Sequence, residues 1–201
     1  MPSFSRNNRR ASSVRRSSRA LGAGVALALA STAALAGGTH RFVFTAFSDA
    51  IGGEEVVAGR YSAALDELKN VPNTGQIDRP AVDTNRCVAY SMTLHWQQAR
   101  AACDAAVRAA VAQQMSPPVW WGWLHTSADD YLAVAYANRA VMHWLSSEDA
   151  AAREDLAKAQ ELSPAAEFVA RNLVALKMHT EVAQEKARGK MAQAAEPAPK
   201  S

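Results

Sequence analysis

The sequence lacks the local patterns that mark most enzymes and metal-binding proteins. It has only two cysteines and five histidines, and it contains neither a CxxC nor an HExxH pattern. The histidines are dispersed, at His40, His95, His125, His143 and His179. No glycine-rich loop follows a strand pattern, which excludes the usual nucleotide-binding signatures. We therefore expect a protein that is not an enzyme and that binds no metal and no cofactor.

Acidic residues are absent from the first 48 positions, whereas six arginines lie before residue 20. This arginine-rich start accounts for the calculated isoelectric point of about 9.0. Without residues 1–36 the chain carries 16 basic and 19 acidic side chains, a net charge of −3. Because residues 37–201 have no excess of basic side chains, we expect no nucleic-acid partner.

Long hydrophobic runs are also missing, except for LGAGVALALASTAALA at residues 21–36. The arginine-rich start, this run and the small residues Ala34 and Ala36 make up the three parts of a secretory signal. The run is 16 residues long, which is shorter than the roughly 20 residues that span a bilayer. We expect residues 1–36 to be a signal peptide and the protein to be exported, periplasmic or secreted. The alternative is an N-terminal membrane anchor through residues 21–36, and membrane contact is expected only if this segment is uncleaved.

One stretch of the sequence occurs in two related copies. NRCVAYSMTLHWQQARAACDAAV begins at Asn85, and NRAVMHWLSSEDAAAREDLAKAQELSP begins at Asn138. A shift of 53 residues aligns identical residues in the two copies, which are Asn85 with Asn138, Arg86 with Arg139, Val88 with Val141, Ala99 with Ala152, Arg100 with Arg153 and Ala106 with Ala159. Chance does not readily place these matches in one register, so the chain contains an internal repeat.

Small and large residues of the second copy recur at helical spacing on two stripes. The stripes are Tyr136, Ala140 and His143, followed by Ala152, Leu156 and Ala159. When Tyr136 is paired with Ala159, Ala140 with Leu156 and His143 with Ala152, the two residue numbers of each pair add up to nearly the same value. This is expected for residues that face each other across two antiparallel helices. Between the stripes, Ser146 followed three residues later by Asp149 fits an N-cap with a capping box. The pattern predicts a helical hairpin in which His143 serves packing.

This spacing resembles the tetratricopeptide repeat (TPR), a helix-turn-helix unit of about 34 residues. In the second copy the signature slots are filled by Tyr136, Ala140, Ala152, Leu156 and Pro164. The first copy keeps residues in the slots of Ala140, His143, Ala152, Leu156 and Ala159, which are Cys87, Tyr90, Ala99, Cys103 and Ala106, whereas Asp83 and Val111 depart at the aromatic and proline slots. A third trace, AGRYSAALDELKN, begins at Ala58 and places Gly59 in an inter-helix turn. The resemblance covers about residues 45–178.

The resemblance implies an all-α fold of antiparallel helix-hairpin repeats, a TPR-like α-solenoid of about three units with a C-terminal capping helix. We expect this domain at residues 37–190, with a Trp-rich insert at about residues 109–127. The capping helix is expected to begin at Ser163 and Pro164. Residues 191–201 are rich in alanine and proline and are expected to be a disordered tail.

The resemblance also implies a function, because TPR proteins typically bind a protein or peptide partner in the concave groove formed by the first helix of each unit. The groove residues expected here are Asn85, Val88, Met92, Asn138, Val141 and Trp144. The two asparagines recur at a slot where relatives hold a ligand backbone, and an asparagine amide both donates and accepts hydrogen bonds. No lysine occupies these positions, so recognition of a terminal carboxylate is not expected.

The Trp-rich insert provides an alternative site. PPVWWGWLH places Trp120, Trp121 and Trp123 in a segment interrupted by proline and glycine. These aromatic side chains either anchor a long loop against the helices or form a platform for a small ligand or a cell-envelope glycan.

Two further pairs of residues have both a chemical and a structural interpretation. Cys87 and Cys103 are expected to face each other across one hairpin, where they form either a disulfide, worth about 3 kcal/mol in the loop-entropy model, or two buried thiols. Asp129 and Asp130 resemble paired catalytic carboxylates. However, Ser127 followed by Asp130 before an apolar run is better explained as a capped helix start.

Overall fold

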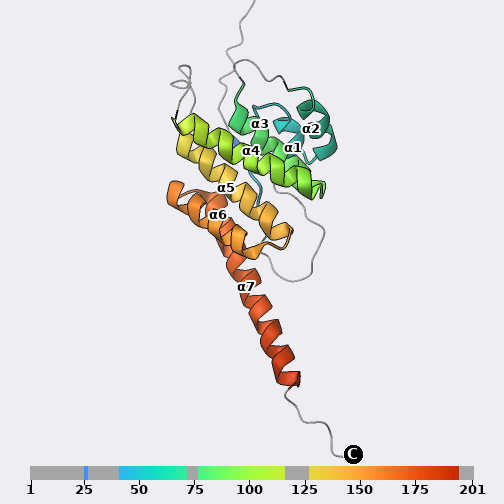
Figure 1. Cartoon of the computed structure of the whole chain (residues 1–201), viewed down its shortest axis with the longest axis vertical. Helices are drawn as coiled ribbons and strands as arrows, with labels where there is room; N and C mark the ends of the chain where they lie inside the picture. The colour runs from blue at the N-terminus through green and yellow to red at the C-terminus, as the bar shows by residue number, and fades with distance from the viewer. Residues whose placement is uncertain (1–24, 27–40, 72–76, 116–126, 195–201) are drawn as a thin grey trace, which may run out of the picture.

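The structure is a computed structural model that describes residues 25–26, 41–71, 77–115 and 127–194. Within these ranges the chain is mostly helical, which agrees with the expected all-α class (Figure 1). The helices are α1 (Gly53–Val57), α2 (Tyr61–Leu68), α3 (Arg79–Met92), α4 (Trp96–Met115), α5 (Ala128–Leu145), α6 (Asp149–Leu162) and α7 (Glu167–Ala194). Two short strands, β1 (Val25–Ala26) and β2 (Ala46–Phe47), pair in antiparallel orientation.

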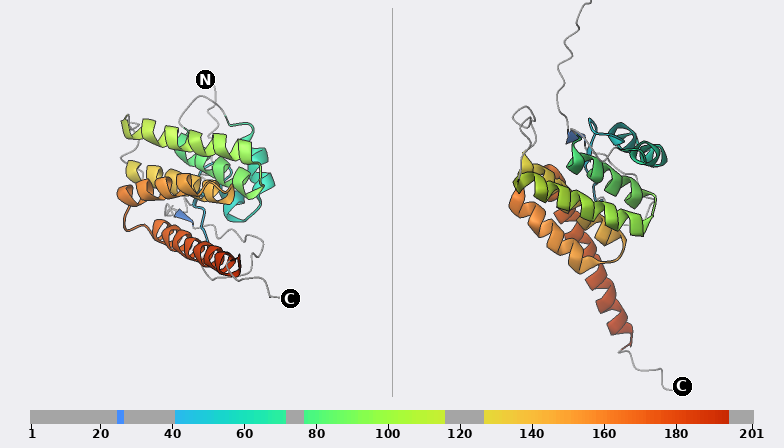
Figure 2. Two further views of the ribbon diagram at one scale, coloured as in Figure 1. Left: turned by 60° about the horizontal axis from the view of Figure 1, so that its bottom comes forward. Right: turned by 45° about the horizontal axis from the view of Figure 1, so that its top comes forward.

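Consecutive helices form antiparallel hairpins that stack on one another. Helix α3 packs along α4 and α5 packs along α6, while α4 and α5 join the two hairpins (Figures 1 and 2). The contacts are close because alanines lie where the helices meet. Ala99, Ala140, Ala152 and Ala159 are all fully buried, and Leu156 fills the space between α5 and α6.

The turns inside the hairpins share one geometry. Gly59, Leu94 and Ser147 each adopt a left-handed conformation, with φ of 75°, 61° and 65°. In each turn the residue after this position donates its N–H to the carbonyl five residues earlier, at 2.8–3.0 Å, which is the pattern of a Schellman C-cap. The spacing of 53 residues between Leu94 and Ser147 equals the shift found in the sequence.

The predicted helix boundaries hold in one case and are wrong in two. Ser127 and Asp130 form the capping box that begins α5, as expected. In contrast, Ser146 is the C-cap of α5, because its N–H bonds to the Met142 carbonyl, and the N-cap of α6 is Glu148 without a side-chain cap. Ser163 is likewise the C-cap of α6, and α7 begins at Glu167 after a short turn rather than at Pro164.

Helix α7 differs from the others because only its first half is packed. Val169, Asn172, Ala175 and Leu176 are buried against the hairpins, whereas residues 181–191 are exposed throughout. The second half of α7 therefore projects away from the body of the molecule (Figure 1). Among the described residues, no helix is both long enough and apolar enough to cross a membrane.

An extended segment, residues 42–48, runs along the inner side of the hairpins and contains β2. Its central residues are as buried as the helical core: the exposed fractions of Val43, Phe44, Thr45, Ala46 and Phe47 lie between 0% and 4%. This segment was not predicted from the sequence. Because α3, α5 and α7 all contact it, it lies in the groove formed by these three helices.

Candidate functional site

The groove is defined by three asparagines, one on each of the helices α3, α5 and α7, and each binds the main chain of one residue in the extended segment. Asn85 Oδ1 accepts a hydrogen bond from the Phe47 N–H at 2.9 Å, and its Nδ2 donates to the Phe47 carbonyl at 2.9 Å. Asn138 binds the Thr45 N–H and carbonyl in the same way, at 2.9 and 2.7 Å.

The third member of this series is Asn172, which binds the N–H and carbonyl of Val43 at 2.7 and 3.0 Å. The asparagines therefore contact every second residue of the segment. This spacing follows from strand geometry, because the N–H and C=O of alternate residues point to the same edge of an extended chain. On the opposite edge of the segment Ala46 pairs with Ala26 of β1, a strand that lies within the expected signal peptide and is lost if residues 1–36 are removed.

The recognition is directed at the main chain and not at polar side chains. All three asparagines are essentially inaccessible to solvent, with exposed fractions of 0–1%. Their amides satisfy backbone groups that would otherwise be buried without partners. In contrast, the Thr45 hydroxyl has no hydrogen-bond partner among the described residues. The groove thus uses polar groups to hold an extended backbone, and it uses shape to fit the side chains.

Apolar side chains fill the remaining space on both sides of the asparagines. Phe44 and Ala46 share one hydrophobic cluster with Val88 and Val141, and Met92 packs against this cluster. At one end of the segment, the Phe42 ring lies 5.2 Å from Trp144 and 5.6 Å from His179, measured between ring centroids. At the other end, Phe47 stacks on Tyr131 at 4.7 Å.

The structure therefore brings together the six residues predicted to line a groove. Asn85, Asn138 and Trp144 contact the segment directly, and Val88, Met92 and Val141 belong to the hydrophobic cluster that holds its side chains. The occupant of the groove in this structure is the protein's own chain. Sequence reasoning missed Asn172, although a signal was present, since Asn172 follows Asn138 by 34 residues, the length of one repeat unit.

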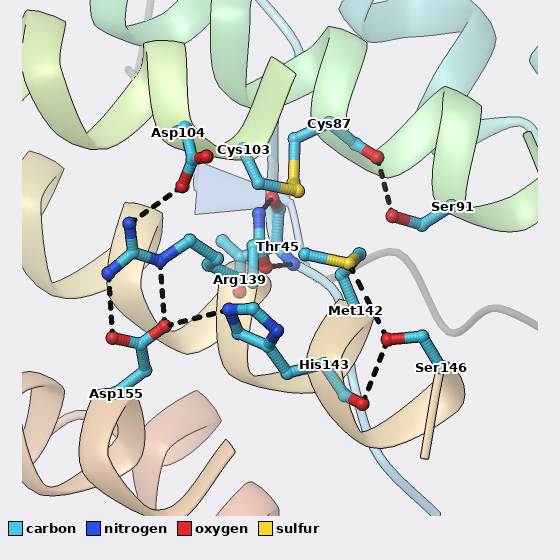
Figure 3. The surroundings of a disulfide bond; sticks show 11 residues. Thr45, Cys87, Ser91, Cys103, Asp104, Arg139, Met142, His143, Ser146 and Asp155 are labelled. Carbon is cyan, nitrogen blue, oxygen red and sulfur yellow. Dashed lines mark hydrogen bonds and ion pairs between the residues drawn. A yellow bond between two sulfur atoms is a disulfide. The ribbon is translucent and has the colours of Figure 1, made fainter. Parts of the chain in front are cut away.

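A charged network connects the helices behind the groove. Arg139 on α5 donates to both carboxylate oxygens of Asp155 on α6, at 2.7 and 2.8 Å, and to Asp104 on α4 at 2.8 Å. Figure 3 shows the guanidinium group of Arg139 between the two carboxylates. The side chain of Asp155 is only 4% exposed, so a bidentate arginine is the partner that its burial requires. These hydrogen bonds, chiefly those with Asp155, raise the pKa of Arg139.

The network continues at the turn between α5 and α6. His143, which is buried as expected, contacts Glu148 through Nδ1 at 2.7 Å. Glu148 also forms an ion pair with Arg100 of α4. The hydrogen bond from Arg100 lowers the pKa of the Glu148 carboxyl from 4.5 to about 2, and the contact with His143 acts in the same direction. The cluster joins three helices, and its charges are paired with one another rather than directed toward a reaction site.

A second polar contact lies at the Phe47 end of the segment. The Tyr131 hydroxyl donates a hydrogen bond to Asp78, the N-cap residue of α3. Burial raises the pKa of Asp78, although the hydrogen bond from Tyr131 opposes this effect. Burial, together with the bond to Asp78, also raises the pKa of Tyr131. Because Asp78 holds the start of α3 and Tyr131 stacks on Phe47, the contact orders one end of the groove.

The two cysteines form a disulfide that joins α3 to α4, with a Cα separation of 4.6 Å. Both residues are buried, and Met142 of α5 packs beside them (Figure 3). The bond lies directly behind the groove helix that carries Asn85 and Val88. It therefore fixes the position of α3 relative to its partner helix.

The other candidate residues do not form a site within the described part of the chain. Asp129 is exposed and bonds to Gln114, while Asp130 caps α5. No group of three or more histidine, cysteine or acidic residues in the described ranges is arranged to hold a metal ion. The platform predicted from Trp120, Trp121 and Trp123 lies outside the described residues.

Comparison of the chain with protein-family models, with curated proteins and with solved structures finds no match.

Proposed function

We propose that this protein is an exported, non-catalytic TPR-like α-solenoid that binds an extended segment of a protein partner in the groove of α3, α5 and α7. The observation that carries the proposal is the series of three asparagines, each of which forms two hydrogen bonds with the main chain of one residue. The groove forms hydrogen bonds only with the main chain of the segment and selects its side chains by their size. It therefore accepts an extended segment of any protein whose side chains fit. Residues 42–48 are then the resident ligand, and a partner binds by replacing them.

The resident segment indicates what a partner must provide. A large apolar side chain is needed at the position of Phe44 and a small one at the position of Ala46, because both are fully buried in the groove. Leaving the groove empty would expose several such side chains, at about 1.5–3 kcal/mol for each large one. Replacement by another extended segment avoids this cost, whereas simple dissociation does not.

The resident segment also keeps the groove closed to weak ligands. A segment tethered by a short connection competes at an effective concentration on the order of 1 mM. A partner segment of equal intrinsic affinity, present at micromolar concentration, then occupies only about one groove in a thousand. Selectivity follows, because only a partner that binds more strongly, or that also contacts the protein elsewhere, replaces the resident segment.

The proposal is tested with a labelled peptide of residues 41–48, RFVFTAFS, and the full chain carrying Thr45→Pro. Proline removes the N–H that Asn138 binds and so weakens the resident segment without changing the groove helices. We expect the peptide to bind this variant in a fluorescence anisotropy titration. Wild type should bind far more weakly, and the additional change Asn138→Ala should abolish binding.

Circular dichroism establishes that the variant retains its helices. If the Thr45→Pro variant is folded and does not bind the peptide, the proposal is wrong. If it does not fold, a photo-crosslinking peptide with a reactive group in place of Phe44 is used on wild type at high concentration. Crosslinks to α3 or α5 support the proposal, and their absence contradicts it.

A further inference from the structure

The packed half and the projecting half of α7 share an exposed apolar stripe that no other part of the described structure covers. Val174, Met178 and Val182 are 45%, 39% and 58% exposed. They are spaced by four residues, so they lie on one face of the helix. The buried residues of α7, among them Asn172 and Leu176, lie on a different face. The stripe is therefore exposed even along the first half of α7, which packs against the hairpins.

The two ends of this stripe carry opposite charges. Arg171 precedes Val174 by three residues and Glu185 follows Val182 by three. At 3.6 residues per turn, all five side chains fall within an arc of about 80° around the helix. Arg171 is 39% exposed in its side chain and lies 3.6 Å from Glu167, and Glu185 is also exposed. Along the helix the stripe therefore has one basic residue, three apolar residues and one acidic residue. Their positions are spaced symmetrically on either side of Met178.

We propose that this stripe binds the same stripe of a second copy of the protein, so that two α7 helices pair in antiparallel orientation about a two-fold axis at Met178. A surface that contacts itself across a two-fold axis must be self-complementary. In this register Met178 meets its counterpart and Val174 meets Val182. Arg171 of each copy meets Glu185 of the other, so both ends of the stripe gain an ion pair.

The charges at the two ends of the stripe also determine the relative orientation of the two helices. A parallel pairing would instead place Arg171 against Arg171 and Glu185 against Glu185, which is unfavourable. Because the stripe is separate from the buried face of α7, the dimer leaves Asn172 and the groove unchanged.

The paired surface is narrower than a standard stable interface, so we expect a dimer whose population depends on protein concentration. Arg171→Glu and Glu185→Arg each place like charges at both ends of the homodimer. We expect each variant of the full chain to raise the dimer dissociation constant about tenfold in analytical ultracentrifugation, which corresponds to about 1.4 kcal/mol. Lys186→Glu, a charge reversal at an exposed position outside the stripe, serves as the control and should change the constant little.

The sharpest test is to mix the two weakened variants. Arg171→Glu in one chain meets Glu185→Arg in the other at one end, and the unchanged Glu185 meets the unchanged Arg171 at the opposite end. Heterodimers should therefore form with about the affinity of the wild type. A mixture that associates no better than either variant alone would overturn the antiparallel register, and a wild type that stays monomeric at every concentration would overturn the dimer.

Crosslinking provides a second readout that does not depend on charge. Met178→Cys places two thiols together at the proposed axis, and mild oxidation should link the two chains. Gln184→Cys, also exposed but on another face, should link poorly. Equal crosslinking at both positions would show that the association is not directed by the stripe.

Discussion

Removing the Asn138 side chain tests the groove most directly. Asn138→Ala leaves both the N–H and the carbonyl of Thr45 buried without partners, because Thr45 is 0% exposed and Asn138 is 1% exposed. Each buried backbone group without a partner costs about 1–3 kcal/mol, so we expect a loss of about 2–6 kcal/mol. This is a large share of the roughly 5–15 kcal/mol that stabilises a typical domain.

Urea unfolding followed by circular dichroism measures this change from the shift in midpoint at constant slope. Asn70→Ala is the matched control, because Asn70 is exposed at the end of α2 and should change stability by less than about 0.5 kcal/mol. If Asn138→Ala is as mild as this control, Asn138 does not hold the segment in solution, and the account of the groove is wrong.

Asn138→Asp separates the two hydrogen bonds of the amide. The carboxylate still accepts from the Thr45 N–H, but its second oxygen replaces the donor and faces the Thr45 carbonyl. Only a protonated carboxyl can donate there, so folding raises the pKa of the introduced group. Its stabilising contribution is therefore present at low pH and is lost as the pH rises through the folded-state pKa. The penalty relative to wild type should be smaller at low pH, and a penalty independent of pH would refute the contact with the carbonyl.

Four further changes test individual contacts, each by urea unfolding. Thr45→Val should stabilise the protein by about 1 kcal/mol, because it removes a buried hydroxyl that has no partner among the described residues; a loss of stability would reveal a partner for that hydroxyl. Arg139→Ala should cost about 3–5 kcal/mol, since it leaves the Asp155 carboxylate buried without a counter-charge, and adding Asp155→Ala should recover part of this loss. The Glu148 carboxylate contributes stability above its ordinary pKa of 4.5 that is lost as the pH falls toward about 2. Because this side chain is 34% exposed, Glu148→Gln should remove at most about 1 kcal/mol of that dependence. Replacing both cysteines with serine should cost about 3 kcal/mol and make stability independent of added reductant.

The helical hairpins were predictable because their signals are local. The spacing of alanines and large apolar residues, repeated after 53 residues, identified α3 to α6 and the faces on which they meet. The boundaries were less accurate. Ser146 and Ser163 look like N-caps in sequence, but each accommodates the end of the preceding helix instead. A serine near a helix junction serves either role, and only the path of the chain decides between them.

The groove was predictable in its walls but not in its contents. Asn85 and Asn138 were identified from their repeated position, at which a ligand backbone was expected, and in the structure both bind the backbone of the protein's own segment. The resident segment was missed because the side chains that bind its main chain are asparagines 38 to 129 residues away in the sequence. Contacts over such distances leave no local periodicity in the sequence.

The order of the three asparagines along the chain has a consequence for how the molecule completes its fold. The asparagine that binds Phe47 lies 38 residues further along the chain, the one that binds Thr45 lies 93 residues further, and the one that binds Val43 lies 129 residues further. Closing the longest of these loops costs about 1 kcal/mol more in entropy than closing the shortest, so we expect the segment to bind from Phe47 toward Val43. The chain emerges with its N-terminus first, whether from the ribosome or across a membrane. Residues 42–48 therefore emerge before any of the three asparagines that bind them. The segment of residues 42–48 is thus synthesised before the helices that form the groove, but it is fully bound only after the last of them has formed.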